Sequence, residues 1–179
     1  MIEKKVLTEI PLFTGDIKMP KGWHLERDEM VKQTTVSHYY EDIDHSFYRT
    51  LDRLQTFILE YMTVEHKINI LRGNNHEPSA RYYERNEISK PLITVDNFNL
   101  RSSPDWVLLY GIEIDPGSCI INIKYDDNRL KDRIWKVNLE TNKFIMFPAI
   151  LQYFVENKNN SHLNYVQTLT FVNNNRLYL

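Results

Sequence analysis

The sequence has little cysteine, little glycine and no long apolar run. One cysteine, Cys119, among 179 residues excludes an internal disulfide framework and is typical of a reducing compartment. The five glycines are dispersed, which excludes a glycine-rich phosphate-binding loop. The longest nearly uncharged segment, residues 143–155, is too short to span a membrane, since a spanning helix needs about 20 apolar residues. We therefore expect no disulfide, no nucleotide loop and no membrane segment.

An excess of one charge sign is also absent. The chain has 22 Lys and Arg against 24 Asp and Glu, so no global positive field attracts a phosphate backbone, and a dedicated nucleic-acid binder is disfavoured. With 42% hydrophobic and 26% charged residues, the composition predicts a globular protein. Residues 1–13 (MIEKKVLTEIPLF) lack the apolar core of a signal peptide. We expect a cytoplasmic protein.

Apolar residues recur at helical spacing between positions 41 and 70. The steps of three and four place these residues on one stripe of a helix of about 20 residues: Phe47, Leu51, Leu54, Ile58, Tyr61 and Met62. One long N-terminal helix is therefore predicted. Upstream, Val6–Phe13 suggests a short edge strand, and residues 72–91 are expected to form a long surface loop.

After Pro91 the apolar period changes to two, which predicts strands. The expected strands are 92–100, 106–114, 119–125, 134–139, 144–147, 151–156 and 165–172. Turn chemistry at 115–118 (DPGS) and at 140–143 (ETNK) predicts two hairpins. Roughly seven short strands in about 80 residues indicate a sandwich or barrel. We expect one domain, 1–179, in which 1–90 hold a strand, the helix and a loop and 91–175 form the β core.

The C-terminal half resembles a known family. Phe147-Pro148, Leu151, Val155 and Asn157 occur in the order seen at the end of the 2-oxoglutarate/Fe(II) dioxygenase fold, in its prolyl-hydroxylase-like branch. The upstream strands and the Pro-Gly turn are similar to the family's first barrel strands. This resemblance, over residues 90–173, implies an α+β, mainly β fold: a jelly-roll (double-stranded β-helix) of seven to eight antiparallel strands with the long helix packed on it.

The resemblance also implies a metal site from which this sequence departs. The family holds iron(II) with two His and one carboxylate, and a basic side chain pairs with 2-oxoglutarate. Here Tyr153 stands at the distal His position, and the segment 97–105 has no His and a single carboxylate, Asp105. Residues 162–172 hold neither Arg nor Lys, so Gln167 lies in a strand that lacks the expected base. We expect no catalytic residue, no metal and no cofactor.

The function expected from these departures is non-catalytic. A barrel without its metal still presents loops and edges to a protein partner, which is either a viral assembly or a second copy of the chain. Abundant Asn, Tyr, Ile and Lys suggest an AT-rich genome, and such family members occur in phages. A phage structural or accessory protein, in the host cytoplasm or the virion, is therefore the expected role.

Two alternatives remain open. The first is an active oxygenase with displaced ligands, in which Asp105 or Asp96 combines with His162 and His76 to hold Fe(II) beside 2-oxoglutarate. The second is a small-ligand-binding module of cupin or lectin type. Aromatic residues would line its pocket: Trp106, Trp135, Tyr153 and Phe171.

Two further sets of residues are candidates for binding. His38, Asp42 and His45 would share one face of a helix and could ligate a metal, although surface histidines at a helix start explain them as well. Exposed Tyr and Arg are preferred anchors of protein interfaces. The partner-binding candidates of this kind are Tyr39, Tyr40, Arg81, Tyr82, Tyr83 and Arg85.

Overall fold

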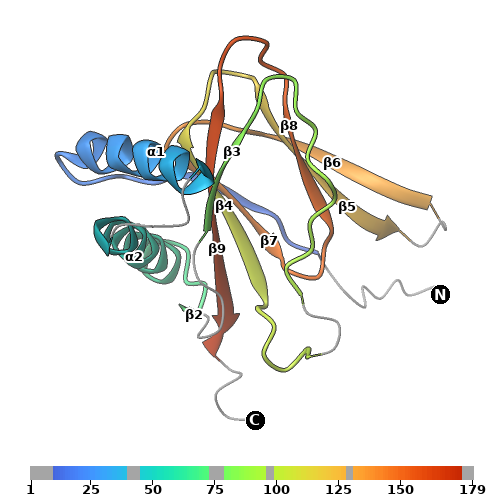
Figure 1. The fold of residues 1–179 in the computed structure, drawn as a ribbon. Helices are drawn as coiled ribbons and strands as arrows, with labels where there is room; N and C mark the ends of the chain where they lie inside the picture. Colours follow the sequence, from blue (N-terminus) through green and yellow to red (C-terminus); the bar gives the residue numbers. More distant parts are fainter. Residues whose placement is uncertain (1–9, 40–44, 73–78, 96–98, 128–130, 175–179) are drawn as a thin grey trace, which may run out of the picture.

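The computed structural model describes residues 10–39, 45–72, 79–95, 99–127 and 131–174, which form two antiparallel β-sheets and two helices (Figure 1). The larger sheet has the order β1-β7-β4-β9-β2, and β3 also pairs with β9. Its strands are β1 (Phe13–Asp16), β2 (Ile70–Arg72), β3 (Ser79–Tyr83), β4 (Trp106–Glu113), β7 (Lys143–Pro148) and β9 (Asn164–Asn173). The smaller sheet, of order β6-β5-β8, contains β5 (Cys119–Asp127), β6 (Lys131–Leu139) and β8 (Tyr153–Asn157).

From β4 onward the chain changes sheet at every connection except the one between β5 and β6. It crosses from β4 to β5, returns from β6 to β7, crosses again from β7 to β8, and returns from β8 to β9. The predicted turn at 115–118 does form: the Ser118 amide donates to the Asp115 carbonyl at 3.1 Å, and Gly117 supplies a φ of 74°. Both predicted hairpins are nevertheless wrong, because each turn joins strands of different sheets. This alternation is the jelly-roll arrangement, so the predicted mainly β fold class is confirmed.

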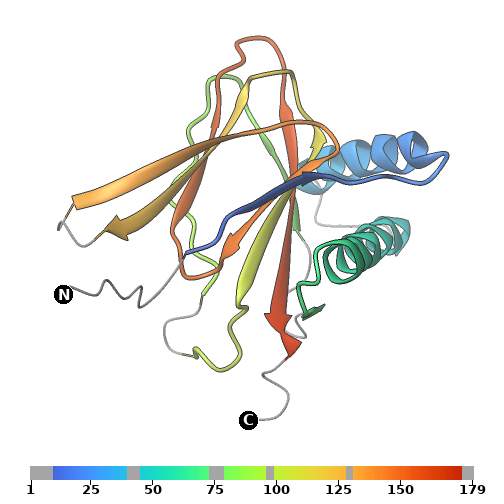
Figure 2. The same ribbon diagram turned by 180° about the vertical axis from the view of Figure 1, so that it is seen from behind.

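Two N-terminal helices, and not the single one predicted, cover one face of the larger sheet (Figure 2). The helix α2 (His45–Glu60) matches the predicted apolar stripe and continues into a π-helical turn at Tyr61–Glu65. The preceding helix, α1 (Trp23–Tyr39), was missed because its buried side mixes apolar and polar residues, such as Met30 with Thr34. Neither helix is long and apolar enough to cross a membrane.

Alternating side chains on the larger sheet build two separate cores. Along β9, Leu169 and Phe171 face the helices, whereas Val166 faces the smaller sheet. Tyr110 on β4 links the helix side to a turn, because its hydroxyl accepts from Trp23 Nε1 at 3.1 Å and donates to Asn142 at 2.7 Å. The space between the two sheets is therefore a second core, and this space contains the candidate site.

The segment predicted as a surface loop, 72–91, contributes to the barrel. It contains β3, which pairs with β9, and then runs beside β8. The Leu92 amide donates to the Tyr153 carbonyl at 2.7 Å, and the Tyr153 amide donates back at 3.0 Å. Of the predicted strand 92–100, the described residues form only this bridge at Leu92, and residues 100–102 form a turn. The predicted N-terminal strand falls partly outside the described residues, and the strand observed there is β1.

Candidate functional site

Tyr153 is the first residue of β8 and lies between the two sheets. Its side chain is only 4% exposed and belongs to the inter-sheet core. The ring packs edge-on against Phe147 of β7, with centroids 5.4 Å apart. Leu92 pairs with it on one side and Ile123 of β5 on the other. The residue at the family's distal His position is therefore a buried aromatic packing element.

The Tyr153 hydroxyl has two neutral partners. The side chains of Thr94 and Thr168 both hydrogen-bond to it, so it joins the segment after Leu92 to β9. Burial raises the pKa of Tyr153 above its usual value, and the two hydrogen bonds oppose that rise only in part. Thr170, two residues further along this face of β9, keeps its own hydroxyl buried without a hydrogen-bond partner among the described residues. The cluster consists of neutral hydroxyl groups.

These groups do not fit ferrous iron. A phenol must lose its proton to become a good ligand, and burial makes that loss harder for Tyr153. The threonine hydroxyls are neutral and contribute no charge to offset the two positive charges of the ion. Within the described part of the chain, no group of three His, Cys, Asp or Glu side chains lies close enough to hold a metal ion.

Asp105 is the second position that the resemblance marked, and the structure gives it a different role. Its carboxylate accepts from the Asn173 amide at 2.8 Å, while its own amide donates to Phe171 at 3.0 Å. Thr168, which contacts Tyr153, pairs with Leu109, four residues along β4 from Asp105. At about 3.3 Å per residue this separation is roughly 13 Å. Asp105 fastens the start of β4 to the end of β9.

Gln167 is the third marked position, and it lies on the opposite face of β9 from Thr168. Strand alternation sets it with Tyr165 and Leu169, whose side chains pack against the helices. Its Nε2 donates to the Thr168 carbonyl at 3.0 Å, and its Oε1 is buried without a partner in the part of the chain that the structure describes. The structure therefore places Gln167 outside the space that contains Tyr153, and the residue that faces the phenol is Thr168.

Two residues of the expected metal set, His38 and His45, belong to separately described helices, and the third, Asp42, lies between them. The helix α1 ends at Tyr39, and α2 begins at His45. Asp42 and Tyr40 lie outside the described residues, and so do the side chains of the two histidines and of Tyr39. The side chains of the proposed metal set therefore lie outside the described residues, and the set stays a prediction.

Among the partner-binding candidates, the two tyrosines of β3 are buried. Tyr82 is 7% exposed and belongs to the helix-side core, and Tyr83 is 3% exposed and belongs to the inter-sheet core. Neither can serve as an exposed anchor. Arg81 is about half exposed, forms an ion pair with Glu87 at 2.6 Å and lies 5.0 Å from the Tyr83 ring centroid. Arg81 is therefore already engaged within the chain.

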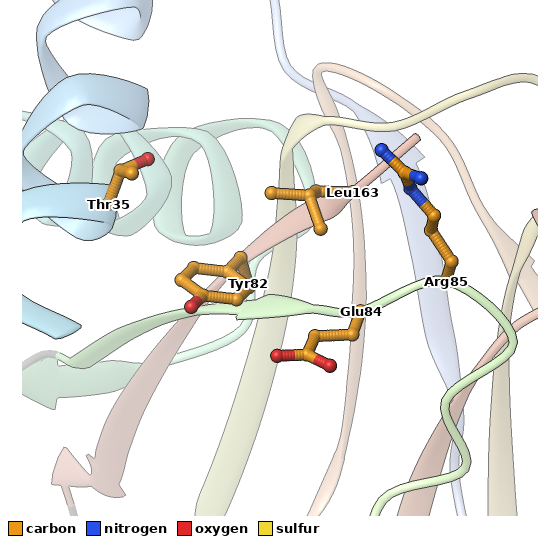
Figure 3. Close-up of a pocket in the computed structure, with 5 residues that line it drawn as sticks. All are labelled: Thr35, Tyr82, Glu84, Arg85 and Leu163. Atoms are coloured by element: carbon orange, nitrogen blue, oxygen red, sulfur yellow. The ribbon is translucent and has the colours of Figure 1, made fainter. Parts of the chain in front are cut away.

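Arg85 borders a surface hollow of about 290 Å³ between α1, the end of β3 and the segment before β9 (Figure 3). The residues that line the hollow are Thr35, Tyr82, Glu84, Arg85 and Leu163. The Thr35 hydroxyl lies 3.0 Å from that of Tyr165, which ties α1 to β9 beneath it. Arg85 has no ion-pair partner among the residues that the structure describes. Figure 3 shows the Arg85 guanidinium and the Glu84 carboxylate pointing in different directions at the hollow, which is typical of a contact surface rather than a reaction site.

The two alternatives from the sequence receive no support from the geometry. His162 precedes β9, whereas Asp105 binds its far end at Asn173, and ten strand residues span about 30 Å. These two residues cannot share an ion, and His76 and Asp96 lie outside the described residues. The aromatic pocket is also wrong, since Phe171 and Trp106 pack on the helix side of the larger sheet.

Cys119 is the only cysteine, and it is fully buried at the start of β5. Burial raises the pKa of its thiol to about 12, so the nucleophilic thiolate is scarce at neutral pH. Cys119 is therefore a buried core residue with an unreactive thiol.

Comparison with known proteins gives matches only at the level of structure. No protein-family model matches the chain, and no curated protein sequence matches it. The non-heme α-ketoglutarate (2-oxoglutarate)-dependent epimerase SnoN from nogalamycin biosynthesis superposes with a TM-score of 0.63 at 8% identity, over 90% of this chain and 77% of SnoN.

Two hydroxylases give similar results. A prolyl hydroxylase from Trichoplax adhaerens, solved with a hypoxia inducible factor peptide, has a TM-score of 0.61 at 10% identity over 92% of this chain and 84% of its own. A Pseudomonas putida prolyl-4-hydroxylase has a TM-score of 0.55 at 8% identity over 90% and 92%. The chain therefore has the double-stranded β-helix fold of the 2-oxoglutarate/Fe(II) oxygenases.

Proposed function

We propose that this chain is a non-catalytic double-stranded β-helix protein that acts by binding another protein. The observation that supports this proposal best is the donor set between the sheets. Where the family resemblance places an imidazole ligand, Tyr153 offers a buried phenol bound to two threonine hydroxyls. A fold does not determine function, and the shared fold does not make this chain an oxygenase.

The second observation that supports the proposal is the structural role of the two other positions that the resemblance marks. Asp105 binds the backbone of β9 at Asn173, and Gln167 lies on the helix side of the larger sheet. A cationic partner for the distal carboxylate of 2-oxoglutarate is missing from β9, because residues 162–172 contain neither Arg nor Lys. Both halves of the cofactor-binding chemistry are therefore lacking at the places where the resemblance predicts them.

Surface features are consistent with a binding role. Arg85 lies in a hollow without an ion-pair partner in the described structure, and several large apolar side chains are exposed. A rigid barrel that presents such groups can dock to a partner without any chemical step. A role as a phage structural or accessory protein stays a prediction from composition and resemblance.

Turnover of 2-oxoglutarate tests this proposal. The purified chain, incubated with iron(II), ascorbate and 2-oxoglutarate, is expected to release no succinate above a protein-free blank, because the donor set does not hold the metal. A prolyl hydroxylase known to be active serves as the positive control. The Tyr153→His variant is expected to stay inactive too, since it restores one imidazole and neither the carboxylate nor the base. Enzyme-dependent succinate from the wild-type chain would overturn the proposal.

A further inference from the structure

The strand at one edge of the smaller sheet, β6, has a paired neighbour on one side only among the described residues. The strand β6 pairs with β5 over nine positions, from Cys119↔Leu139 to Asp127↔Lys131. No strand among the described residues pairs with its other side. The opposite edge of this sheet is covered, because the segment that contains Ser89 and Leu92 hydrogen-bonds to β8. Unpaired amides and carbonyls along β6 therefore remain available to another chain.

The free edge also extends beyond the body of the barrel. The strand β8 pairs with β5 only from Cys119 to Ile123, whereas β6 continues along β5 as far as Asp127. The far part of the antiparallel pair β5–β6 projects away from the other strands as an arm, visible in both orientations (Figures 1 and 2). A second molecule can approach β6 there without meeting the helices.

The side chains on the outer face of β6 are apolar and basic. Trp135 and Val137 pack toward the inter-sheet core, so the alternating residues Ile134 and Lys136 face outward. Ile134 is 43% exposed, which is unusual for an isoleucine in a strand, and Lys136 is exposed without an ion-pair partner in the described part of the chain. Lysine on an edge strand blocks random pairing and admits a strand that offers a matching carboxylate.

We propose that β6 pairs in antiparallel fashion with β6 of a second copy of this chain, with the two-fold axis at Ile134. In this register the two isoleucines lie opposite each other, and position 132, an aspartate in the sequence, lies opposite Lys136 on both sides of the axis. An axis at Trp135 would set Ile134 against Lys136, and an axis at Lys136 would set two lysines together. Only the first of these registers satisfies both the apolar contact and the charges.

This pairing joins two three-stranded sheets into one continuous sheet across the dimer and satisfies the backbone groups of both edges. It rests on the proposed binding function, because it names the partner of that function as the chain itself. The two tests are independent, because succinate release tests for catalysis between the sheets, whereas the oligomeric state tests the pairing of β6 with a second copy.

Charge exchange on the full-length chain tests the register. Sedimentation equilibrium is expected to show a wild-type dimer, and Lys136→Asp is expected to raise its Kd at least about tenfold, because two carboxylates then face each other in each pair. Asp132→Lys is expected to do the same. Mixing the two single variants should give a heterodimer, and the double variant D132K/K136D should recover wild-type affinity.

A matched control distinguishes the effect of a charge change on β6 from the effect of the same change elsewhere on the surface. Lys90→Asp makes the same charge change in the segment that covers the opposite edge of the smaller sheet, beside β8, and is expected to leave the Kd unchanged. Circular dichroism of each variant checks that the fold is retained. A wild-type chain that is monomeric at about 100 μM, well above the micromolar Kd of a stable interface, would overturn the proposal. A dimer insensitive to Lys136→Asp and Asp132→Lys would also overturn it.

Discussion

Replacing Tyr153 by alanine is expected to lower the free energy of unfolding by about 3–5 kcal/mol, as for other large-to-small changes of buried aromatic residues. The substitution removes a ring that is 4% exposed and packed edge-on against Phe147, and it leaves the hydroxyls of Thr94 and Thr168 without their partner. Urea denaturation followed by circular dichroism measures the change. A loss of this size is expected if Tyr153 has become part of the core.

Two control variants locate the origin of this effect. Tyr153→Phe keeps the ring and removes only the hydroxyl, so a smaller loss of about 1–3 kcal/mol is expected from the unpaired threonines. Phe154→Ala, on the outer face of the same strand, truncates an aromatic ring that is only half buried and is expected to cost less than Tyr153→Ala. If Tyr153→Ala left the urea midpoint unchanged, the structural role assigned to the phenol would be wrong.

Gly111→Ala is expected to destabilise the chain by about 3 kcal/mol, at the upper end of the usual overpacking range. Gly111 lies in β4 beside the turn before β7, where the Asn142 amide donates to its carbonyl at 2.9 Å. A methyl group there would overlap the Glu140 carbonyl, a backbone group that cannot turn aside. The backbone would therefore have to move where the chain passes from β6 to β7.

Gly117→Ala is the matched control for this prediction. Gly117 has a φ of 74°, and a methyl group there would meet nothing within 4 Å. Only backbone strain is expected, at a cost of roughly 1 kcal/mol. Thermal unfolding of both variants gives the comparison. Equal losses would show that the close approach at Gly111 tolerates a side chain.

Local pattern predicted the strands after position 100 well. The segments 106–114, 119–125 and 165–172 correspond to β4, β5 and β9 within about two residues, because alternation and turn residues are local signals. The pairing of those strands is not local. The turns at 115–118 and 140–143 form, yet the strands that they join enter different sheets, because burial between the sheets and against the helices decides the partner.

The N-terminal half was harder to predict for an identifiable reason. The helix α1 covers the sheet partly with polar residues, such as Gln33 and Thr34, so its apolar period is weak. The strand β3 is short, and its neighbouring tyrosines enter opposite cores, which makes the stretch look like an uninterrupted polar and aromatic loop. In both cases tertiary contacts supply the stability that the local pattern does not show.

The candidate site was predicted in part. The resemblance located Tyr153 correctly on the strand before the last, but it could not reveal the partners of the phenol. Thr94 and Thr168 are far from Tyr153 in sequence, and they meet it only because the segment after β3 runs beside β8 while β9 pairs with β4. The alternation of side chains along β9 could have indicated Thr168 as the residue that faces Tyr153, since Gln167 points to the same side of the strand as Leu169.

Equilibrium dialysis of the full-length chain against iron(II) under anaerobic conditions, with and without 2-oxoglutarate, tests the central claim most directly. Elemental analysis then gives the iron retained per chain. The neutral hydroxyl cluster around Tyr153 predicts no iron above the level of the dialysis buffer in either condition. Stoichiometric iron that Tyr153→Phe releases would contradict the account, because the phenol would then be a ligand and the barrel a metal centre.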